Sequence, residues 1–248
     1  MGLEQLRVIG NGDAFGTGGR YHTCFYLESS ETKFLVDLGA TAIQNLQSKV
    51  ELNDINLIII SHLHGDHFGG IPFFLLNSAF QTNRSKSLTI IGPEGCEGRI
   101  NSPTENLYKG ITHKLERFDL NIIEYETGVI NKYKDLEILA LPAIHSDESN
   151  SHCLQIVSGE TKFAYSGDTE WTDDLYKVAH DADYFICECS YYSTQMNGHL
   201  SYLELDKKLE DLTTKKILLT HLSSEMLDEE NSVNVRFDNA EEDEVYLF

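Results

Sequence analysis

Hydrophobic residues fall into short runs rich in β-branched and aromatic side chains, and these runs predict strands. The strands are expected at 5–10, 23–28, 33–39, 57–62, 87–92, 136–143, 152–158, 162–168, 184–190, 215–221 and 244–248. Spacing typical of helices is found at 40–50 and near 66–79, 94–109, 172–180 and 201–212. This alternation of strands and helices predicts an α/β fold built in layers.

One strand–turn–strand segment resembles another further along the chain. Residues 24–34, CFYLESSETKF, and 153–163, CLQIVSGETKF, share Cys, Ser, Glu, Thr, Lys and Phe in register. In each case the second strand runs into a loop that carries an aspartate, Asp37 in the first and Asp168 in the second. A duplicated hairpin would bring both acidic loops to one edge of a two-sheet sandwich. Chance resemblance of two hairpins is the alternative.

The composition is that of a globular protein with one core. The chain has 248 residues, 41% of them hydrophobic, and no low-complexity tract divides it. We therefore expect residues 1–248 to form a single domain. The N-terminal segment lacks the features of a secretory signal, and no apolar stretch has the length of a membrane span. Five cysteines without C-x-x-C spacing are typical of reduced thiols and predict a cytoplasmic protein.

A strong negative charge limits the possible partners. The formal net charge is −21 at pH 7, whereas affinity for nucleic acids depends mainly on Lys and Arg that neutralise phosphates. We therefore expect no binding to long nucleic acid and no membrane partner. An anionic substrate would have to be small and held by a local positive charge, which bound metal could supply. The sequence leaves the oligomeric state open, a homodimer included.

Candidate metal ligands cluster in the segment SHLHGDHFGG, residues 61–70. The buried strand ends just before it, so the cluster lies on the loop that leads into the next helix. His62 and His64 are two residues apart and point the same way in extended backbone, and Gly65 lets the chain bend before Asp66 and His67. Two pairs of ligands can therefore face two metal positions. The alternative is a solvated loop in which Asp66 caps the helix.

Three further candidates follow strands elsewhere in the chain. His145, Asp168 and His221 come directly after the strand-like runs 136–144, 162–167 and 215–220. Each alone could be structural, but their shared position and the histidine cluster together favour metal binding. A catalytic divalent metal usually has three or four protein ligands and an open position.

These residues resemble those of the metallo-β-lactamase fold hydrolases. The H-x-H-x-D-H signature of that family is present here, followed by two histidines and an aspartate in the family's order: His62, His64, Asp66, His67, His145, Asp168 and His221. The resemblance spans nearly the whole chain. It implies a four-layer αββα sandwich, in which helices flank two mixed sheets and a two-metal site lies at one edge.

The resemblance also implies how the ligands divide. By that mapping His62, His64 and His145 bind one metal. Asp66, His67 and His221 bind the other, Asp168 bridges the two, and Asp37 orients the histidine loop. Two divalent ions lower the pKa of a shared water, so a metal-bound hydroxide can hydrolyse the substrate, with Asp66 also among the catalytic residues. Imidazole and carboxylate ligands suit zinc best, although iron or manganese is acceptable.

Further segments look like the branch that contains the tRNA 3′-end processing endonucleases and small phosphodiesterases. These segments are YSGDT, CECSYY, GHLS and LTHLSS. In that branch a glutamate and a histidine outside the metal ligands protonate the leaving oxygen, and Glu188 and His199 occupy the matching places. The alternative is structural: Glu188 ends a strand and His199 caps a helix that begins near Ser201.

The chain departs from the tRNA-processing enzymes in one important respect. Those enzymes carry a long tRNA-gripping arm between the third histidine and the bridging aspartate, but the segment from His145 to Asp168 has room only for a loop and a hairpin. Together with the acidity, this argues against tRNA as substrate. The glycine-rich segment 10–20 is expected to form a lip beside the metals, with Arg20 as a candidate for anion contact.

Three functional hypotheses remain, in order of preference. The first is a dinuclear metal-dependent phosphodiesterase acting on a small or cyclic phosphodiester, which Glu188 and His199 favour. The second is a hydrolase of carboxylic esters, thioesters or lactones, which would not need His199 for a good leaving group. The third is a non-hydrolytic metal-binding protein, either a binding module or a di-iron redox protein. A redox protein of this type usually has a carboxylate in place of His64.

Overall fold

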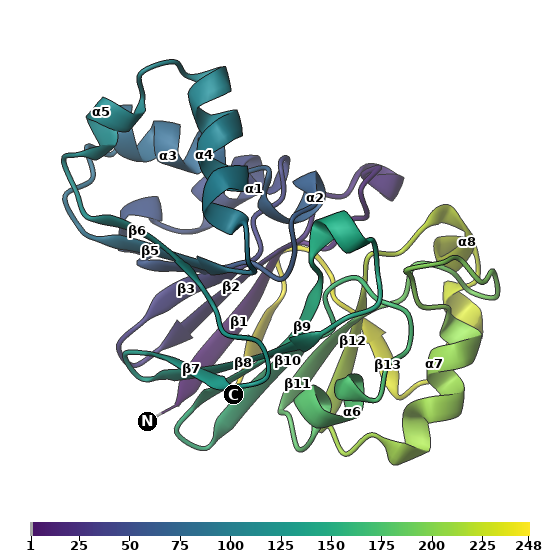
Figure 1. Ribbon diagram of the computed structural model, residues 1–248. Coiled ribbons are helices and arrows are strands. Elements are labelled where there is room, and N and C mark those ends of the chain that lie inside the picture. The colour runs from purple at the N-terminus through teal and green to yellow at the C-terminus, as the bar shows by residue number, and fades with distance from the viewer. Residues whose placement is uncertain (1) are drawn as a thin grey trace.

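Two seven-stranded mixed sheets pack face to face, and helices cover the outer side of each (Figure 1). The computed structural model describes residues 2–248. Three hydrophobic clusters correspond to the interfaces of four layers: one cluster lies between the sheets, and one lies between each sheet and its helices. The predicted α/β fold, a four-layer αββα sandwich, is confirmed.

The first sheet has the strand order β14-β1-β2-β3-β4-β5-β6. Its strands are β1 (Leu3–Gly10), β2 (Cys24–Ser29), β3 (Lys33–Val36), β4 (Leu57–Ile59), β5 (Leu88–Gly92), β6 (Leu120–Glu124) and β14 (Val245–Leu247). Alternate side chains of β3 face different layers. Phe34 and Val36 belong to the cluster between the sheets, whereas Leu35 packs in the cluster below the helices.

The second sheet has the order β13-β12-β11-β10-β9-β8-β7. Its strands are β7 (Ile130–Tyr133), β8 (Leu136–Pro142), β9 (His152–Ser158), β10 (Thr161–Tyr165), β11 (Tyr184–Glu188), β12 (Lys216–Thr220) and β13 (Phe237–Asn239). Strands β10 to β13 run parallel, as do β3 to β6 in the first sheet. Polar residues that follow these parallel strands therefore meet at one edge of the sandwich.

Helices occupy the two outer layers (Figure 1). They are α1 (Ala42–Lys49), α2 (Gly65–Phe68), α3 (Ile71–Phe80), α4 (Cys96–Leu107) and α5 (Thr112–Leu115) over the first sheet, and α6 (Asp174–Ala179), α7 (Tyr202–Lys208) and α8 (Ser224–Asp228) over the second. Short 3-10 turns lie at Thr17–Gly19, Leu52–Asp54, Asp147–Ser149, Leu209–Asp211 and Glu230–Ser232. Within residues 2–248, no helix combines the length and the apolar character needed to cross a membrane.

The two resembling segments form equivalent antiparallel hairpins, β2–β3 and β9–β10, each at the centre of its sheet. The loops that follow them meet at His67. Its Nδ1 lies 2.8 Å from Asp37 Oδ2, and its Nε2 lies 3.4 Å from Asp168 Oδ1. The expectation that both acidic loops reach one edge therefore agrees with the structure.

The structure differs from the predicted elements in three ways. The short helices α5 and α8 were not expected. Strands β6, β7 and β13 were not expected, because they are short and largely exposed or lie at the sheet edges. The helix expected near 66–79 is broken into α2 and α3 at Gly69 and Gly70. A Cβ on Gly70 would lie 2.6 Å from the carbonyl oxygen of Gly39, so this close approach requires glycine.

Candidate metal centre and active site

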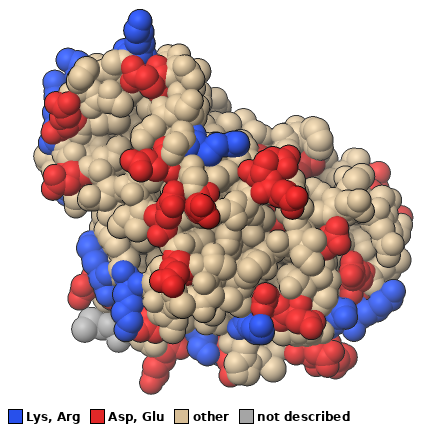
Figure 2. All heavy atoms as spheres, viewed as in Figure 1, with Lys and Arg blue, Asp and Glu red and all other residues tan. Residues whose placement is uncertain are grey.

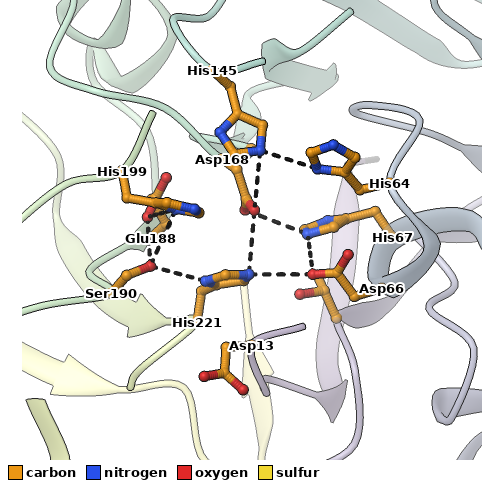
Figure 3. A network of polar contacts seen from close by, with 12 residues as sticks. Asp13, His64, Asp66, His67, His145, Asp168, Glu188, Ser190, His199 and His221 are labelled. Atoms are coloured by element: carbon orange, nitrogen blue, oxygen red, sulfur yellow. Dashed lines mark hydrogen bonds and ion pairs between the residues drawn. The ribbon is translucent and has the colours of Figure 1, made fainter. Parts of the chain in front are cut away.

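All seven predicted metal ligands converge at one edge of the sandwich. Figure 3 shows the side chains of His64, Asp66, His67, His145, Asp168 and His221 gathered there. The nitrogen and oxygen atoms of the seven ligands form two groups, each with atoms within 4.8 Å of one another. One group is His62, His64 and His145, and the other is Asp66, His67, Asp168 and His221. This division is the one that the family resemblance implied.

The spacing of the ligand atoms fits a metal ion. In the second group His221 Nε2 lies 3.2 Å from Asp168 Oδ2 and 3.3 Å from Asp66 Oδ2. Ligand atoms about 2.0–2.1 Å from a tetrahedral zinc are about 3.3 Å from one another. The carboxylate of Asp168 also lies 3.8 Å from His62 Nε2 and 4.0 Å from His145 Nε2, so it stands between the two groups.

Several of these atoms are buried without a hydrogen-bond partner. They are His62 Nε2, His67 Nε2 and Asp168 Oδ1. Buried polar atoms are normally satisfied, because an unpaired one costs about 1–3 kcal/mol. In addition, the ring atoms His64 Nδ1 and His145 Nε2 face each other at 3.1 Å, where either a shared proton or a bound cation satisfies both nitrogens. The residues present therefore fit a metal centre.

Asp37 fixes the orientation of the histidine loop. Its Oδ1 accepts the Ser61 N–H at 2.8 Å, and its Oδ2 accepts the Ser61 hydroxyl at 2.7 Å and His67 Nδ1–H at 2.8 Å. Because the Ser61 hydroxyl donates to Asp37, Ser61 Oγ accepts from Nδ1–H of His62 at 3.0 Å. Both His62 and His67 therefore turn Nε2, and not Nδ1, toward the site.

The other three histidines are oriented in the same way by neighbours. His145 Nδ1–H donates to the carbonyl oxygen of Gly198 at 2.7 Å, which leaves its Nε2 free. His221 Nδ1 pairs with Ser190 Oγ at 2.9 Å. His64 is reversed: its Nε2 pairs with Ser146 Oγ at 3.1 Å, so Nδ1 faces the site. Each ring thus presents one defined nitrogen.

Burial and neighbouring charges shift the pKa values of the site residues in different directions. Burial lowers the pKa of His62 well below its ordinary value, so this ring is neutral at pH 7. Burial also opposes charge on His221, but the carboxylates of Asp168, Asp66 and Glu188 together outweigh it and raise the pKa of His221 to about 9. Burial would raise the pKa of Asp168, but His221 and His67 hold it well below its ordinary value. Without metal, protons on histidines balance the carboxylates, so metal binding should release protons.

Glu188 and His199 lie together beside the metal ligands (Figure 3). Glu188 is fully buried at the end of β11, and its Oε2 lies 3.1 Å from His199 Nδ1. Its other oxygen accepts the Thr169 N–H. Burial lowers the pKa of His199, but the Glu188 carboxylate outweighs this effect and raises it above the ordinary value. The charged imidazolium is therefore favoured in a position that faces the cavity.

A cavity of about 570 Å³ opens over these side chains. Its wall includes the site residues and the segment Asp13–Thr17, so the glycine-rich lip borders the cavity as expected. No described residue of this wall is a lysine or an arginine, and Arg20 lies outside it. Figure 2 shows acidic side chains over the centre of the viewed face, with many of the basic ones toward its margins.

Sequence reasoning missed several residues of the site. Asp13 lines the cavity and binds its own loop, accepting from the Thr17 hydroxyl at 2.6 Å and from the Thr17 N–H at 2.9 Å. Ser61, Ser146 and Ser190 contact site histidines. Each of these serines lies within two residues of a predicted site residue, and this closeness in the sequence was the available signal. For Asp13 the sequence offered no signal beyond its position in the glycine-rich lip.

The cysteines take no part in the site. All five are buried and unpaired. Cys187 and Cys189 lie on one face of β11 and just beyond it, in the core between the second sheet and its helices. Burial raises the pKa of both thiols, so they are protonated and packed as apolar groups.

The fold is that of the metallo-β-lactamase fold proteins. YhfI from Bacillus subtilis, a protein of that fold, superposes with a TM-score of 0.80 at 22% identity, covering 98% of this chain and 99% of YhfI. A diphosphatase from the PhnP family superposes with a TM-score of 0.76 at 14% identity, covering 100% of this chain and 98% of the other.

The chain belongs to the family described as Anti-Pycsar protein Apyc1, whose family model matches residues 4–246. It is also similar to ribonuclease Z from Clostridium beijerinckii, with 25% identity over 290 aligned positions that cover 94% of this chain and 92% of the relative. The predicted place of the chain near the tRNA-processing and phosphodiesterase branch is confirmed.

Proposed function

We propose that the protein is a dinuclear metal-dependent phosphodiesterase that acts on a small or cyclic phosphodiester. The observation that carries this proposal is the shared cavity, in which two ligand groups joined by Asp168 face the Glu188–His199 pair. The names of the relatives, a ribonuclease Z and a diphosphatase, support chemistry at phosphorus.

We assign the seven converging side chains as metal ligands, with His62, His64 and His145 at one ion. Asp66, His67 and His221 hold the second ion, and Asp168 serves both. Two bound divalent ions would supply positive charge to the phosphate oxygens and lower the pKa of a water molecule. We favour zinc, since the ligand atoms are imidazole nitrogens and carboxylate oxygens, and iron or manganese would also be accepted.

The remaining groups of the cavity handle protons. Asp66 lines the cavity with a carboxylate whose pKa is held below its ordinary value: burial alone would raise it, and His67 outweighs that effect. Asp66 is thus suited to orient the attacking water. Nδ1 of His199 faces Glu188, so Nε2 is the nitrogen free to protonate the leaving oxygen as the P–O bond breaks. An alkoxide leaving group needs this proton more than a phenolate does.

The residues that line the cavity favour a small substrate with one phosphate. No described lysine or arginine lines it to neutralise further phosphates, and the chain carries a formal net charge of −21. The segment between His145 and Asp168 consists of a 3-10 turn and the β9–β10 hairpin. These observations argue against long nucleic acid as substrate. Five unpaired cysteines favour a reducing compartment such as the cytoplasm.

The test is His199→Ala, assayed on zinc-loaded protein with two diesters. We expect turnover of a 3′,5′-cyclic nucleotide, whose leaving group is an alkoxide, to fall by about 10²–10⁴-fold. Turnover of bis(p-nitrophenyl) phosphate should fall by less than about tenfold, because p-nitrophenolate leaves without a proton. His113→Ala removes an exposed histidine bonded only to Glu116 and serves as control. An equal loss on both substrates, or lactone hydrolysis faster than diester hydrolysis, would contradict the proposal.

A further inference from the structure

The segment Asp168–Glu170 contacts every part of the site. Asp168 stands between the two ligand groups, and the Thr169 N–H donates to the Glu188 carboxylate. The side chain of Glu170 points elsewhere: its Oε1 accepts the N–H of Gly198 at 2.8 Å. Gly198 immediately precedes His199 in the chain. Glu170 therefore holds the backbone from which the proton donor projects.

The peptide of Gly198 also supports a metal ligand. Its carbonyl oxygen accepts His145 Nδ1–H at 2.7 Å. Gly198 has φ +82°, and a Cβ placed on it would lie 2.7 Å from His145 Nδ1. Both the left-handed backbone and the close approach require glycine here. One residue therefore accepts from His145 on one side and is held by Glu170 on the other.

Glu170 is itself tied to the strand end that carries His145. Its N–H donates to the carbonyl oxygen of Ile144 at 2.8 Å, and the Ile144 N–H donates to Thr169 Oγ1 at 2.9 Å. The backbone contact thus fixes the residue before His145, while the side-chain contact fixes the residue before His199. These contacts close a ring that joins a metal ligand to the proton donor.

We propose that Glu170 is a positioning residue that acts through Gly198 to set both His145 and His199. The N–H and the carbonyl group of Gly198 belong to successive peptide groups, so a carboxylate that holds the N–H fixes the position of the whole residue. The carbonyl oxygen held in this way accepts His145 Nδ1–H, which leaves Nε2 of His145 facing the metal site. The inference rests on the proposed metal site, because Nε2 of His145 is assigned there as a ligand.

The two rings held in this way lie close together. The centroids of His145 and His199 are 4.8 Å apart, with their planes at 71°. His199 also keeps its own contact with Glu188 at 3.1 Å. A shift of the Gly198 peptide therefore moves the donor away from the metal ligands while Glu188 still holds one side of its ring. Loss of Glu170 should weaken both metal binding and proton transfer.

The test compares Glu170→Ala, Glu170→Gln and Gly198→Ala. Zinc affinity is measured by competition with a chelator on metal-free protein, and kcat and KM are measured on zinc-loaded protein. We expect Glu170→Ala to lower the affinity for one of the two zinc ions by about 10–100-fold, the usual effect of losing a residue that orients a metal ligand. Glu170→Gln keeps an acceptor oxygen but not the charge, so its zinc affinity should fall between those of the alanine variant and the original protein.

The kinetic result should separate positioning from substrate binding. At saturating zinc, kcat of Glu170→Ala should fall while KM stays unchanged, because His199 is displaced and the other residues of the cavity wall are not. Gly198→Ala should lower the affinity for the same zinc ion. If Glu170→Ala does not fold, Gly198→Ala is the variant that tests the inference. Glu105→Ala is the matched control, since Glu105 Oε1 accepts the N–H of Gly110 at 2.6 Å in a loop remote from the site.

Two outcomes would overturn the inference, and they differ in meaning. If the original protein binds two zinc ions and hydrolyses a diester, but the Glu170 and Gly198 variants keep its zinc affinity and kcat, only the positioning role fails. If the original protein binds no zinc, both this inference and the proposed function fail.

Discussion

Replacement of Asp37 by asparagine would test how the histidine loop is held. Asp37 is fully buried and accepts three hydrogen bonds, two from Ser61 and one from His67. Its φ of 58° lies in the left-handed region, which asparagine also tolerates, so the substitution changes the hydrogen bonds and leaves the backbone unstrained. The result therefore reports on the carboxylate alone.

The magnitude follows from counting acceptors. In its better orientation the amide oxygen of the introduced asparagine replaces Oδ2 of Asp37 and keeps the Ser61 hydroxyl and His67, while the amide NH₂ group meets the Ser61 N–H, a donor facing a donor. One buried charge-assisted bond is lost, which should lower the free energy of unfolding by about 2–3 kcal/mol. His67 also loses its charged partner, so zinc affinity should fall by about 10–100-fold.

The assay combines thermal unfolding of the metal-free protein with chelator competition for zinc. Asp135→Asn is the control: Asp135 accepts from Thr32 Oγ1 at 2.8 Å and from Ser158 Oγ at 3.0 Å, which ties together the two central hairpins far from the site. This control should lose stability and keep its zinc affinity. Unchanged zinc affinity in Asp37→Asn would refute the reasoning.

Two further predictions concern the core and the proton donor. Arg84 is 1% exposed and donates to the carbonyl oxygens of Leu52, Ile55, Lys86 and Ser87. Arg84→Met removes these four hydrogen bonds and should lower the free energy of unfolding by at least about 3 kcal/mol in urea titration, so a smaller loss would contradict its structural role. The pKa of His199 is raised mainly by Glu188 against the effect of burial, so the protonated donor persists above pH 6.5 and diester turnover should fall as pH rises through the raised pKa. That basic limb should be absent from the pH profile of His199→Ala, and a profile identical to that of the original protein would contradict the assignment.

The strands that carry the site could be predicted because they are buried on both faces. Runs such as residues 57–60 have no polar position, so the first histidine after the run marks the strand end. Asp168 and His221 follow the same rule, and parallel strands then bring them together. His145 follows β8, which pairs antiparallel with β9 and has alternating burial. The convergence of the seven side chains was therefore accessible from the sequence, whereas their tautomers were not.

Contacts between distant loops could not be predicted. Glu170 and Gly198 are far apart in sequence, and nothing in their local pattern indicates that Gly198 contacts Glu170 through its N–H and His145 through its carbonyl oxygen. Arg84 shows the same limit, since a charged residue in a polar segment is expected at the surface and is instead enclosed by four carbonyl oxygens. Strands β6 and β7 are largely exposed, so their sequences lack the buried apolar positions from which a strand is predicted.

Anomalous diffraction from zinc-loaded crystals, together with metal analysis of the same protein, tests the central claim most directly. The account predicts two ions for each chain, one held by His62, His64 and His145, the other by Asp66, His67 and His221, with Asp168 in contact with both. Fewer than two ions in this cavity, or ions bound by other residues, would contradict it.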